Sequence, residues 1–384
     1  MKKIIFITGS RSDYFIQRPI LNLLKKNKLF KIFIILTGSH LSKKYGMTKK
    51  IVETDNYGKI HIVRSFIESN KLESRSLGAS IQLNKIIKIL SKINPNLVIA
   101  PYDREEAITL ALAATYNNIP IVHLGAGDNT EFNVDALIRH SVSKLSQIMI
   151  TSTVENKNRL IRMGENKKNI FNVGHTALDR YNNITKLSKK KLGIFFKIPF
   201  TSKPIILLVQ HPISNYYKEV ERQYKETLEA IDKINLPTII IKPNSDPGSL
   251  KIIKQIDNFN FKNNKLVSIF QNIPELYFTN LMKEISLIVG NSSMGILESA
   301  IFKTPVVNIG KRQIKRQNSG NVIFVSHNKK MIIKAIKYSL FNLDYQKKLK
   351  KCKNVYGKGN ASKKIISILE KIKYKSEILI KKYP

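Results

Sequence analysis

The chain has little of three things that each mark a class of protein: cysteine, acidic side chains and long apolar runs. Cys352 is the single cysteine among 384 residues, which excludes a disulfide framework and a cysteine-based metal site. No stretch reaches the roughly 18 apolar residues that a membrane-spanning helix needs. The opening MKKIIFITGSR is interrupted by Gly9 and Arg11, too early for a signal peptide. We therefore expect a cytoplasmic protein with no membrane partner.

The shortage of acidic residues leaves a strongly basic chain. There are 27 Asp and Glu against 66 Lys and Arg, for a formal charge of +39. Such an excess can mark a protein that binds nucleic acid. The lysines are spread from end to end, however, and no recognition motif or interleaving of aromatic with basic residues accompanies them. We expect no nucleic-acid partner.

Short apolar runs alternate with helical patterns along the whole chain. The runs are continuous and rich in β-branched residues, which indicates strands buried on both faces of a parallel sheet. The first series of expected strands is Ile4–Thr8, Lys31–Thr37, Leu97–Ala100, Ile121–Leu124 and Ile148–Ser152. The second series is Ile205–Gln210, Thr238–Lys242, Val267–Phe270, Leu287–Val289, Val306–Ile309 and Val322–Val325. Helical patterns of the first half include Gln17–Asn27, Ser80–Ile93 and Glu105–Tyr116.

A polar, lysine-rich stretch at 182–203 separates the two series. With 384 residues and 42% hydrophobic side chains, the chain is long enough for two packed cores. The predicted fold class is α/β, with two doubly wound Rossmann-like domains. We place the first domain at 1–180 and the second at 204–360. The remaining segment, 361–384, contains an amphipathic helix to about 373, and we expect it to pack against the first domain.

The most informative segment runs from residue 287 to 313. A strand ends at Gly290-Asn291, Ser292 and Ser293 follow, and a helical pattern spans Met294–Phe302. A strand, a turn of small residues and a helix start together aim backbone N–H groups at an anion such as a phosphate. Asn and Ser also cap helices that bind no ligand.

A carboxylate and a basic group in the same segment favour the ligand-binding interpretation. Glu298 lies in the helical pattern, and Lys311-Arg312 follows the next strand. Such a pair is suited to hold a sugar ring and a second phosphate. The segment therefore predicts a nucleotide-sugar site.

Polar residues also follow the expected strands of the first domain, where doubly wound sheets bind their ligands. Arg11 could reach a phosphate, while Asp13 is either a ligand contact or a helix cap. Asp103 is either a carboxylate of the binding cleft or the cap of a helix that starts at Arg104. His40 and Asp128 also follow strands.

A helical pattern in the first domain and two strand ends in the second carry further candidates. Asp135 and Arg139 are four residues apart, which places them on one helix face as an ion pair or as a solvated bridge. In the second domain His211 follows the first strand, and Lys242 and Asn244 follow the next. Together these side chains predict one convergent polar site.

In its motifs and their order the sequence resembles the hydrolysing UDP-N-acetylglucosamine 2-epimerases of bacterial sialic-acid-type pathways. The motifs that carry the resemblance are GSRSDY (9–14), GSHLSKKYGMT (38–48), DREEA (103–107), VDALIRHSVSKL (134–145), VGHTALDR (173–180), QHP (210–212), KPNSDPGS (242–249), NSSMGILE (291–298), GKRQIKR (310–316) and SGNV (319–322). They cover nearly the whole chain. The resemblance implies two domains of the glycosyltransferase-B type with the ligand in the interdomain cleft, and it implies a homodimer.

The resemblance also implies roles for individual residues. UDP would be bound by Arg11, Ser292, Ser293, Gly295, Glu298 and Arg312. The catalytic or sugar-contacting set would hold Asp103, Asp135 and His211, with Asp128 at the usual acidic position. Asp13, His40, Arg104, Arg139, Lys242 and Asn244 complete the expected substrate-binding set.

The implied reaction eliminates UDP across C1–C2 to give a glycal and then adds water with inversion at C2. It needs a base, an acid and a neutralised leaving group, and no metal or cofactor. Carboxylates in a poorly hydrated cleft can have raised pKa values that suit this work.

Two positions depart from the family pattern. Tyr102 stands where the family usually has glycine, and Gly125 stands where it usually has Glu or His. Relatives that act on UDP-2,4-diacetamido-2,4,6-trideoxyhexoses also vary there, so the substrate is either such a sugar or UDP-N-acetylglucosamine. A non-hydrolysing epimerase, a glycosyltransferase and a non-catalytic UDP-sugar binder are the alternative functions.

Overall fold

The computed structural model describes residues 1–69, 71, 73–130, 134–201, 203–372 and 381. Its contacts divide the chain into two compact units. The N-terminal unit gathers Met1–Asn129, Val134–Asp179 and the chain from Tyr356 onward, and the C-terminal unit holds Arg180–Val355. Thr130 is also assigned to the C-terminal unit, and the main connections between the units that the described residues show follow Asp179 and Val355.

The N-terminal unit is built on a seven-stranded parallel sheet with the order β3-β2-β1-β4-β5-β6-β7. Its strands are β1 Lys2–Thr8, β2 Phe30–Leu36, β3 Lys59–Ile62, β4 Leu97–Pro101, β5 Ile121–Leu124, β6 Ile148–Thr151 and β7 Ile170–Asn172. Its α-helices are α1 Arg11–Lys25, α2 Lys49–Asp55, α3 Glu73–Ile93, α4 Glu105–Tyr116, α5 Val134–Leu145, α6 Val154–Arg162 and α14 Ala361–Lys371. The expected strands are present, and the edge strands β3 and β7 were not foreseen.

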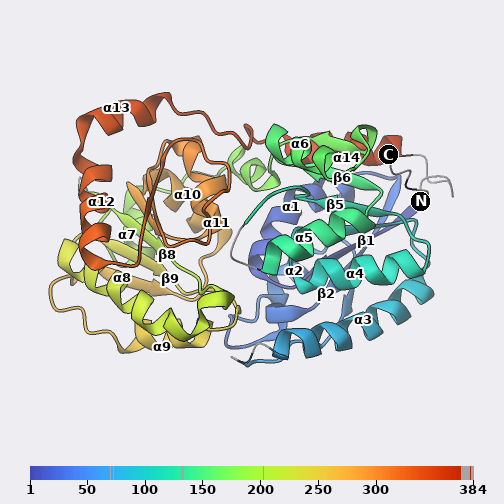
Figure 1. The fold of residues 1–384 in the computed structure, drawn as a ribbon, viewed down its shortest axis with the longest axis horizontal. Coiled ribbons are helices and arrows are strands. Elements are labelled where there is room, and N and C mark those ends of the chain that lie inside the picture. The colour runs from blue at the N-terminus through green and yellow to red at the C-terminus, as the bar shows by residue number, and fades with distance from the viewer. Residues whose placement is uncertain (70, 72, 131–133, 202, 373–380, 382–384) are drawn as a thin grey trace. The chain divides into compact units, whose positions relative to one another are not determined.

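Helices cover both faces of this sheet, which explains why its strands are continuous apolar runs. Ile20 and Leu24 of α1 and Leu369 of α14 pack on one face, and Ile86 of α3 and Leu110 of α4 pack on the other. Helix α14 is the last helix of the chain but packs within the N-terminal unit, against α1 at its beginning (Figure 1). Helix α14 ends at Lys371, and residue 373, where we expected the helix to end, lies outside the described residues.

The C-terminal unit has a six-stranded parallel sheet with the order β10-β9-β8-β11-β12-β13. Its strands are β8 Ile206–Val209, β9 Thr238–Ile241, β10 Val267–Phe270, β11 Leu287–Gly290, β12 Val306–Ile309 and β13 Val322–Val325. Its α-helices are α7 Lys189–Phe196, α8 Val220–Ile234, α9 Ser249–Asn258, α10 Glu275–Glu284, α11 Ser293–Leu297, α12 Lys329–Phe341 and α13 Leu343–Lys351. Two doubly wound α/β sheets confirm the predicted fold class.

Two stretches of the C-terminal unit differ from their expected form. The polar 182–203 stretch contains α7, in which Leu192 and Phe196 are buried, and Phe196 packs against Phe270 of β10. The expected helix Met294–Phe302 is instead the five-residue α11 followed by a 3-10 turn at Ser299–Phe302. Glu298 stands at the junction of the two.

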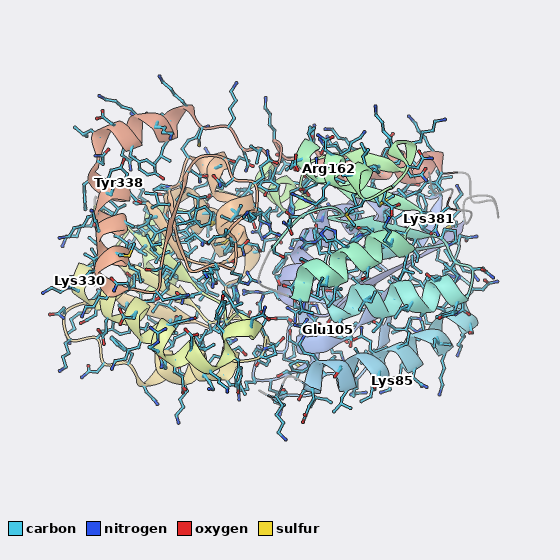
Figure 2. The ribbon with its side chains drawn as sticks, viewed as in Figure 1. Lys85, Glu105, Arg162, Lys330, Tyr338 and Lys381 are labelled. Carbon is cyan, nitrogen blue, oxygen red and sulfur yellow. The ribbon has the colours of Figure 1, made fainter. Side chains whose placement is uncertain are left out.

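The excess of basic charge is carried by side chains on outer elements of both units. Lys85 on α3 and Lys330 on α12 are exposed, and Figure 2 shows their side chains extending away from the ribbon. Within the described part of the chain, no helix has the length and apolar character needed to cross a membrane.

Candidate active site

The predicted site residues gather at the switch points of the two sheets, where the strand order reverses and such folds open a ligand crevice. In the N-terminal unit β1 lies beside β4, and in the C-terminal unit β8 lies beside β11. The chain that leaves β1 and β4 carries Arg11, Asp13, Asp103 and Arg104. The chain that leaves β8 and β11 carries His211, Ser292 and Ser293.

A buried arginine joins two of the predicted carboxylates in the N-terminal unit. Arg139 on α5 is 1% exposed and forms ion pairs with Asp103 after β4 and with Asp128 after β5, the latter at 3.5 Å. A guanidinium buried this deeply requires carboxylate partners close by. The structure therefore brings together two of the predicted site carboxylates from two separate strand exits.

The alternative roles for Asp103 and Asp13 as helix caps are wrong. Helix α4 begins at Glu105 with Arg104 at the N-cap position. Helix α1 is capped by Ser10, whose hydroxyl accepts a hydrogen bond from the Asp13 N–H at 3.4 Å and donates one to the Asp13 carboxylate at 2.7 Å. Ser10 is therefore the N-cap residue, the Asp13 carboxylate only accepts from its hydroxyl, and Arg11 lies in the first turn. Asp135 likewise lies in the first turn of α5.

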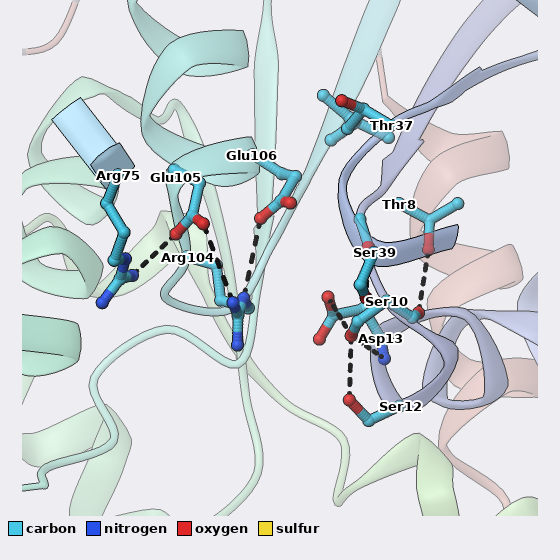
Figure 3. A network of polar contacts seen from close by, with 12 residues as sticks. Thr8, Ser10, Ser12, Asp13, Thr37, Ser39, Arg75, Arg104, Glu105 and Glu106 are labelled. Atoms are coloured by element: carbon cyan, nitrogen blue, oxygen red, sulfur yellow. Dashed lines mark hydrogen bonds and ion pairs between the residues drawn. The ribbon is translucent and has the colours of Figure 1, made fainter. Parts of the chain in front are cut away.

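A chain of alternating charges lies beside this turn (Figure 3). Arg75 pairs with Glu105 at 2.6 Å, and Arg104 lies between Glu105 at 3.7 Å and Glu106 at 3.8 Å. Burial alone would raise the pKa of Glu105, but Arg104 and Arg75 outweigh it and the pKa is lowered. The Arg104 guanidinium thus lies within ion-pair distance of two carboxylates. The expected contact between Arg104 and the substrate stays a prediction.

Glu106 is the buried carboxyl of this chain of charges. Burial, reinforced by the negative charge of Glu105, raises its pKa to about 8, so the group is largely protonated at neutral pH. A β-carbon built on Gly9 would fall 1.6 Å from the Glu106 Oε1. Because Gly9 has no side chain, the Glu106 carboxyl can pack directly against the backbone of Gly9, just after β1.

His40 is held by two threonines in the interior. Its Nε2 lies 2.9 Å from the Thr8 hydroxyl and its Nδ1 2.7 Å from the Thr48 hydroxyl. Burial lowers its pKa to about 3, so the ring stays neutral. These contacts tie the end of β1 to the loop after β2, which is a structural role. Contact between His40 and a substrate stays a prediction.

In the C-terminal unit Asn291 fixes the chain around His211. The Asn291 side chain accepts from the His211 N–H at 2.7 Å and donates to the His211 carbonyl at 2.9 Å. The His211 Nδ1 accepts from the Asn244 N–H at 3.3 Å. The Lys242 ammonium pairs with Asp257 at 2.5 Å. The structure thus joins His211 and Asn244, while Lys242 forms an ion pair with a residue outside the predicted set.

The expected anion site lies around the start of α11. Ser292 is its N-cap residue, Ser293 begins the helix, and Gly295 is buried within it. The Arg312 guanidinium donates to the Asn291 carbonyl at 3.2 Å, which places this cation beside the same turn. Because α11 has only five residues, its dipole is small, and backbone N–H groups and Arg312 would supply most of the attraction for an anion.

Glu298 is held by two neighbours that sequence reasoning missed. Its Oε2 accepts from the Tyr181 hydroxyl at 2.5 Å and from Arg180. Arg180 also lies over the ring of Phe278, 4.6 Å from its centroid. Among the described residues, both hydrogen bonds to the carboxylate end on Oε2, so Oε1 is the oxygen left for a ligand.

Comparisons with known proteins agree with this geometry. Residues 22–370 match the family described as UDP-N-acetylglucosamine 2-epimerase. The chain is 31% identical over 385 residues to the UDP-N,N'-diacetylbacillosamine 2-epimerase (hydrolyzing) of Legionella pneumophila, covering 99% of each chain. It is 33% identical to the polysialic acid biosynthesis protein P7 of Escherichia coli, covering 88% of this chain and 86% of that protein.

The chain belongs to the UDP-N-acetylglucosamine 2-epimerase family. It is an enzyme of the hydrolysing branch, as its motifs predicted. A crystal structure of the UDP-GlcNAc 2-epimerase from Neisseria meningitidis bound to UDP-GlcNAc superposes with a TM-score of 0.80 at 21% identity, covering 96% of this chain and 100% of that one. That likeness confirms the glycosyltransferase-B type of fold.

In this 2-epimerase, sequence reasoning missed the residues that support the site. These are Glu106, which lies against Gly9, Arg180, which holds Glu298, and His123, which donates to the Tyr102 carbonyl, and each contact joins residues far apart in sequence. The VGHTALDR motif contains Arg180 and was a signal for it, and His123 at the end of a buried strand was a weaker one. Among the described residues no cluster of three or more His, Cys, Asp or Glu side chains could hold a metal ion.

Proposed function

We propose that this 2-epimerase hydrolyses a UDP-2-acetamido sugar and releases UDP and the free sugar inverted at C2. The observation that carries the proposal is the buried Arg139 that holds Asp103 and Asp128 together. Inversion at C2 removes a proton from one face of the ring and returns one to the other, so it needs two acid–base groups. Two carboxyl groups from two strand exits, one acting as the base and one as the acid, meet that need.

In the first step one carboxylate of the pair, assigned here to Asp103, takes the proton from C2. The electrons of that C–H bond form the C1–C2 double bond, and the bond from C1 to the UDP oxygen breaks with its electrons on the diphosphate. In the second step the oxygen of a water molecule adds to C1, and C2 takes a proton on the opposite face. We assign that proton to Asp128, which enters the step protonated and is reprotonated by the proton that the water gives up. Asp103 releases the C2 proton to solvent, and Asp135 is a third acid–base group.

The departing diphosphate requires neutralisation by the protein. We assign this to Arg312 and to the backbone N–H groups of Ser292 and Ser293, and we assign the ribose to Glu298. His211 and Arg11 complete the groups that we place on the substrate. The match to the Legionella enzyme over the full length of both chains favours UDP-N,N'-diacetylbacillosamine over UDP-N-acetylglucosamine as the sugar.

The test is incubation of the purified protein with each of these two UDP-sugars, followed by NMR of the products. We expect UDP and a free sugar inverted at C2, with faster turnover of the diacetamido sugar. An inverted sugar that remains attached to UDP would show a non-hydrolysing epimerase. UDP-sugar that is bound in calorimetry but unchanged after prolonged incubation would show a binding protein. Either result overturns the proposal.

A further inference from the structure

Two positions that set this sequence apart, Tyr102 and Gly125, are neighbours in space. Tyr102 follows β4 and Gly125 follows β5, the adjacent strand. A β-carbon built on Gly125 would lie 2.3 Å from the Tyr102 Cδ1 and 2.6 Å from its Cε1, distances that no real contact reaches. The ring of Tyr102 thus fills the volume that a side chain at position 125 would need.

Tyr102 is anchored at every polar group it has. Its N–H donates to the Leu124 carbonyl at 2.9 Å, and its carbonyl accepts from the His123 Nε2 at 2.7 Å. Its hydroxyl lies 3.1 Å from the Thr176 hydroxyl, and its ring packs against His175 with centroids 5.6 Å apart. These contacts hold a φ of +51°, a conformation that costs a non-glycine residue about 1 kcal/mol or more unless its surroundings impose it.

The contacts that hold Tyr102 in place also extend toward Asp103 and its ion-pair partner Arg139. A carbonyl only accepts, so the His123 Nε2 carries the proton and its Nδ1 accepts from Ser143, 2.9 Å away on α5. Ser143 lies on α5, four residues after Arg139, so this hydrogen bond ties the Tyr102 backbone to the helix that carries Arg139. Asp103 is the next residue after Tyr102, and Arg139 is its ion-pair partner. The contacts of Tyr102 and His123 therefore reach the backbone of both members of this ion pair.

We propose that Tyr102 is a positioning residue that sets the direction of the Asp103 carboxylate, and that Gly125 is glycine because the Tyr102 ring occupies its side-chain space. The inference rests on the proposed function and deepens it, since it names the residues that fix the proposed base. Tyr102 acts through Asp103 and makes no proton transfer of its own.

The proposal predicts strong coupling between positions 102 and 125 in a double-mutant cycle. Gly125→Ala places a methyl group inside the Tyr102 ring and displaces it together with Asp103. We expect kcat to fall by between about tenfold and a hundredfold, while KM stays within about twofold, because Asp103 acts in the transition state. Tyr102→Gly permits the same φ but removes the ring, and it should lower kcat similarly.

The double variant Tyr102→Gly/Gly125→Ala shows whether Gly125→Ala lowers kcat by a clash with the Tyr102 ring or by an effect that does not depend on that ring. With the ring absent, the alanine methyl meets no aromatic atom, so adding Gly125→Ala to Tyr102→Gly should cost little further kcat. Tyr102→Phe keeps the ring and should recover most of the turnover lost in Tyr102→Gly. Equal cost of Gly125→Ala in both backgrounds, or no rescue by phenylalanine, overturns the proposal.

A control substitution at Gly320 separates the steric overlap between position 125 and the Tyr102 ring from the backbone strain of a positive φ. Gly320 has a φ of +83°, and no atom lies within 4 Å of its built β-carbon. The loss of thermal stability in Gly320→Ala therefore measures the cost of positive φ alone, and Gly125→Ala should lose more. Similar losses would argue against the overlap.

A crystal structure of the Gly125→Ala variant separates failure of this inference from failure of the proposed function. If the wild-type protein releases no sugar, the proposed reaction is wrong. The positioning inference then stands or falls on the variant's structure, in which we expect a displaced Tyr102 ring and a broken Asp103–Arg139 ion pair. An unchanged ion pair in that structure overturns it.

Discussion

Replacing Glu106 with glutamine removes a titrating proton from the interior of the N-terminal unit and keeps the size of the side chain. In the folded protein, burial and the charge of Glu105 raise the pKa of Glu106 from the ordinary 4.5 to about 8. Its Oε2 has no hydrogen-bond partner among the described residues, and the ion pair to Arg104 is long, at 3.8 Å. The neutral acid is therefore the form that the fold accommodates.

The sign of the effect follows from proton linkage. Between about pH 4.5 and 8 the folded state holds a proton on Glu106 that the unfolded state has released, so raising the pH favours unfolding. One proton corresponds to at most about 1.4 kcal/mol per pH unit. The wild type should lose a few kcal/mol of unfolding free energy through this group as the pH rises across that window, and Glu106→Gln should not.

Urea unfolding of both proteins at intervals from pH 5 to 8.5 measures the difference. We expect similar stabilities at pH 5 and a more stable Glu106→Gln variant at pH 8. Other titrating groups are common to the two proteins and cancel. Glu53→Gln, which changes an exposed carboxylate on α2, is the control and should leave the pH profile unchanged.

The reasoning fails if the stabilities of wild type and Glu106→Gln run parallel from pH 5 to 8. A second arm tests the cause of the shift. Because the negative charge of Glu105 contributes to it, Glu105→Gln should move the pH-dependent loss to lower pH without abolishing it. An unmoved profile in that variant would show that the charge of Glu105 does not contribute to the raised pKa of Glu106.

Three further substitutions test the assigned roles. Asp103→Asn should lower kcat by about 10²–10⁴ with UDP affinity within a few-fold by calorimetry, and near-native turnover would remove Asp103 from the mechanism. Arg312→Ala should weaken UDP binding by ~1–3 kcal/mol, the scale of a lost charge-assisted contact, and unchanged calorimetric affinity would contradict that role. Arg180→Ala should release Glu298 from its fixed position. It should therefore weaken binding of UDP more than binding of 2′,3′-dideoxy-UDP, and equal losses would separate Arg180 from ribose recognition.

The interior strands were predictable because helices cover both faces of each sheet and most residues in these strands are apolar. The edge strand β3 escaped prediction because only one neighbour pairs with it and its residues Lys59–Ile62 are partly or fully exposed. Strand β7 has three residues, too few for a pattern. The break at Glu298 was also missed, because the segment contains no helix-breaking residue and the contacts of that carboxylate with Arg180 and Tyr181 come from a distant part of the chain.

The sequence by itself determined the two α/β domains, the family and the strand exits that carry polar side chains. These follow from local patterns, since strands that run parallel bring their exits to one edge of the sheet. Tertiary structure alone decided which side chains meet there. Arg139 is 36 residues from Asp103 and 11 from Asp128, and the ring of Tyr102 explains Gly125. Burial cannot be read from a local sequence pattern. It raises the pKa of Glu106, so that this carboxyl is largely protonated at neutral pH.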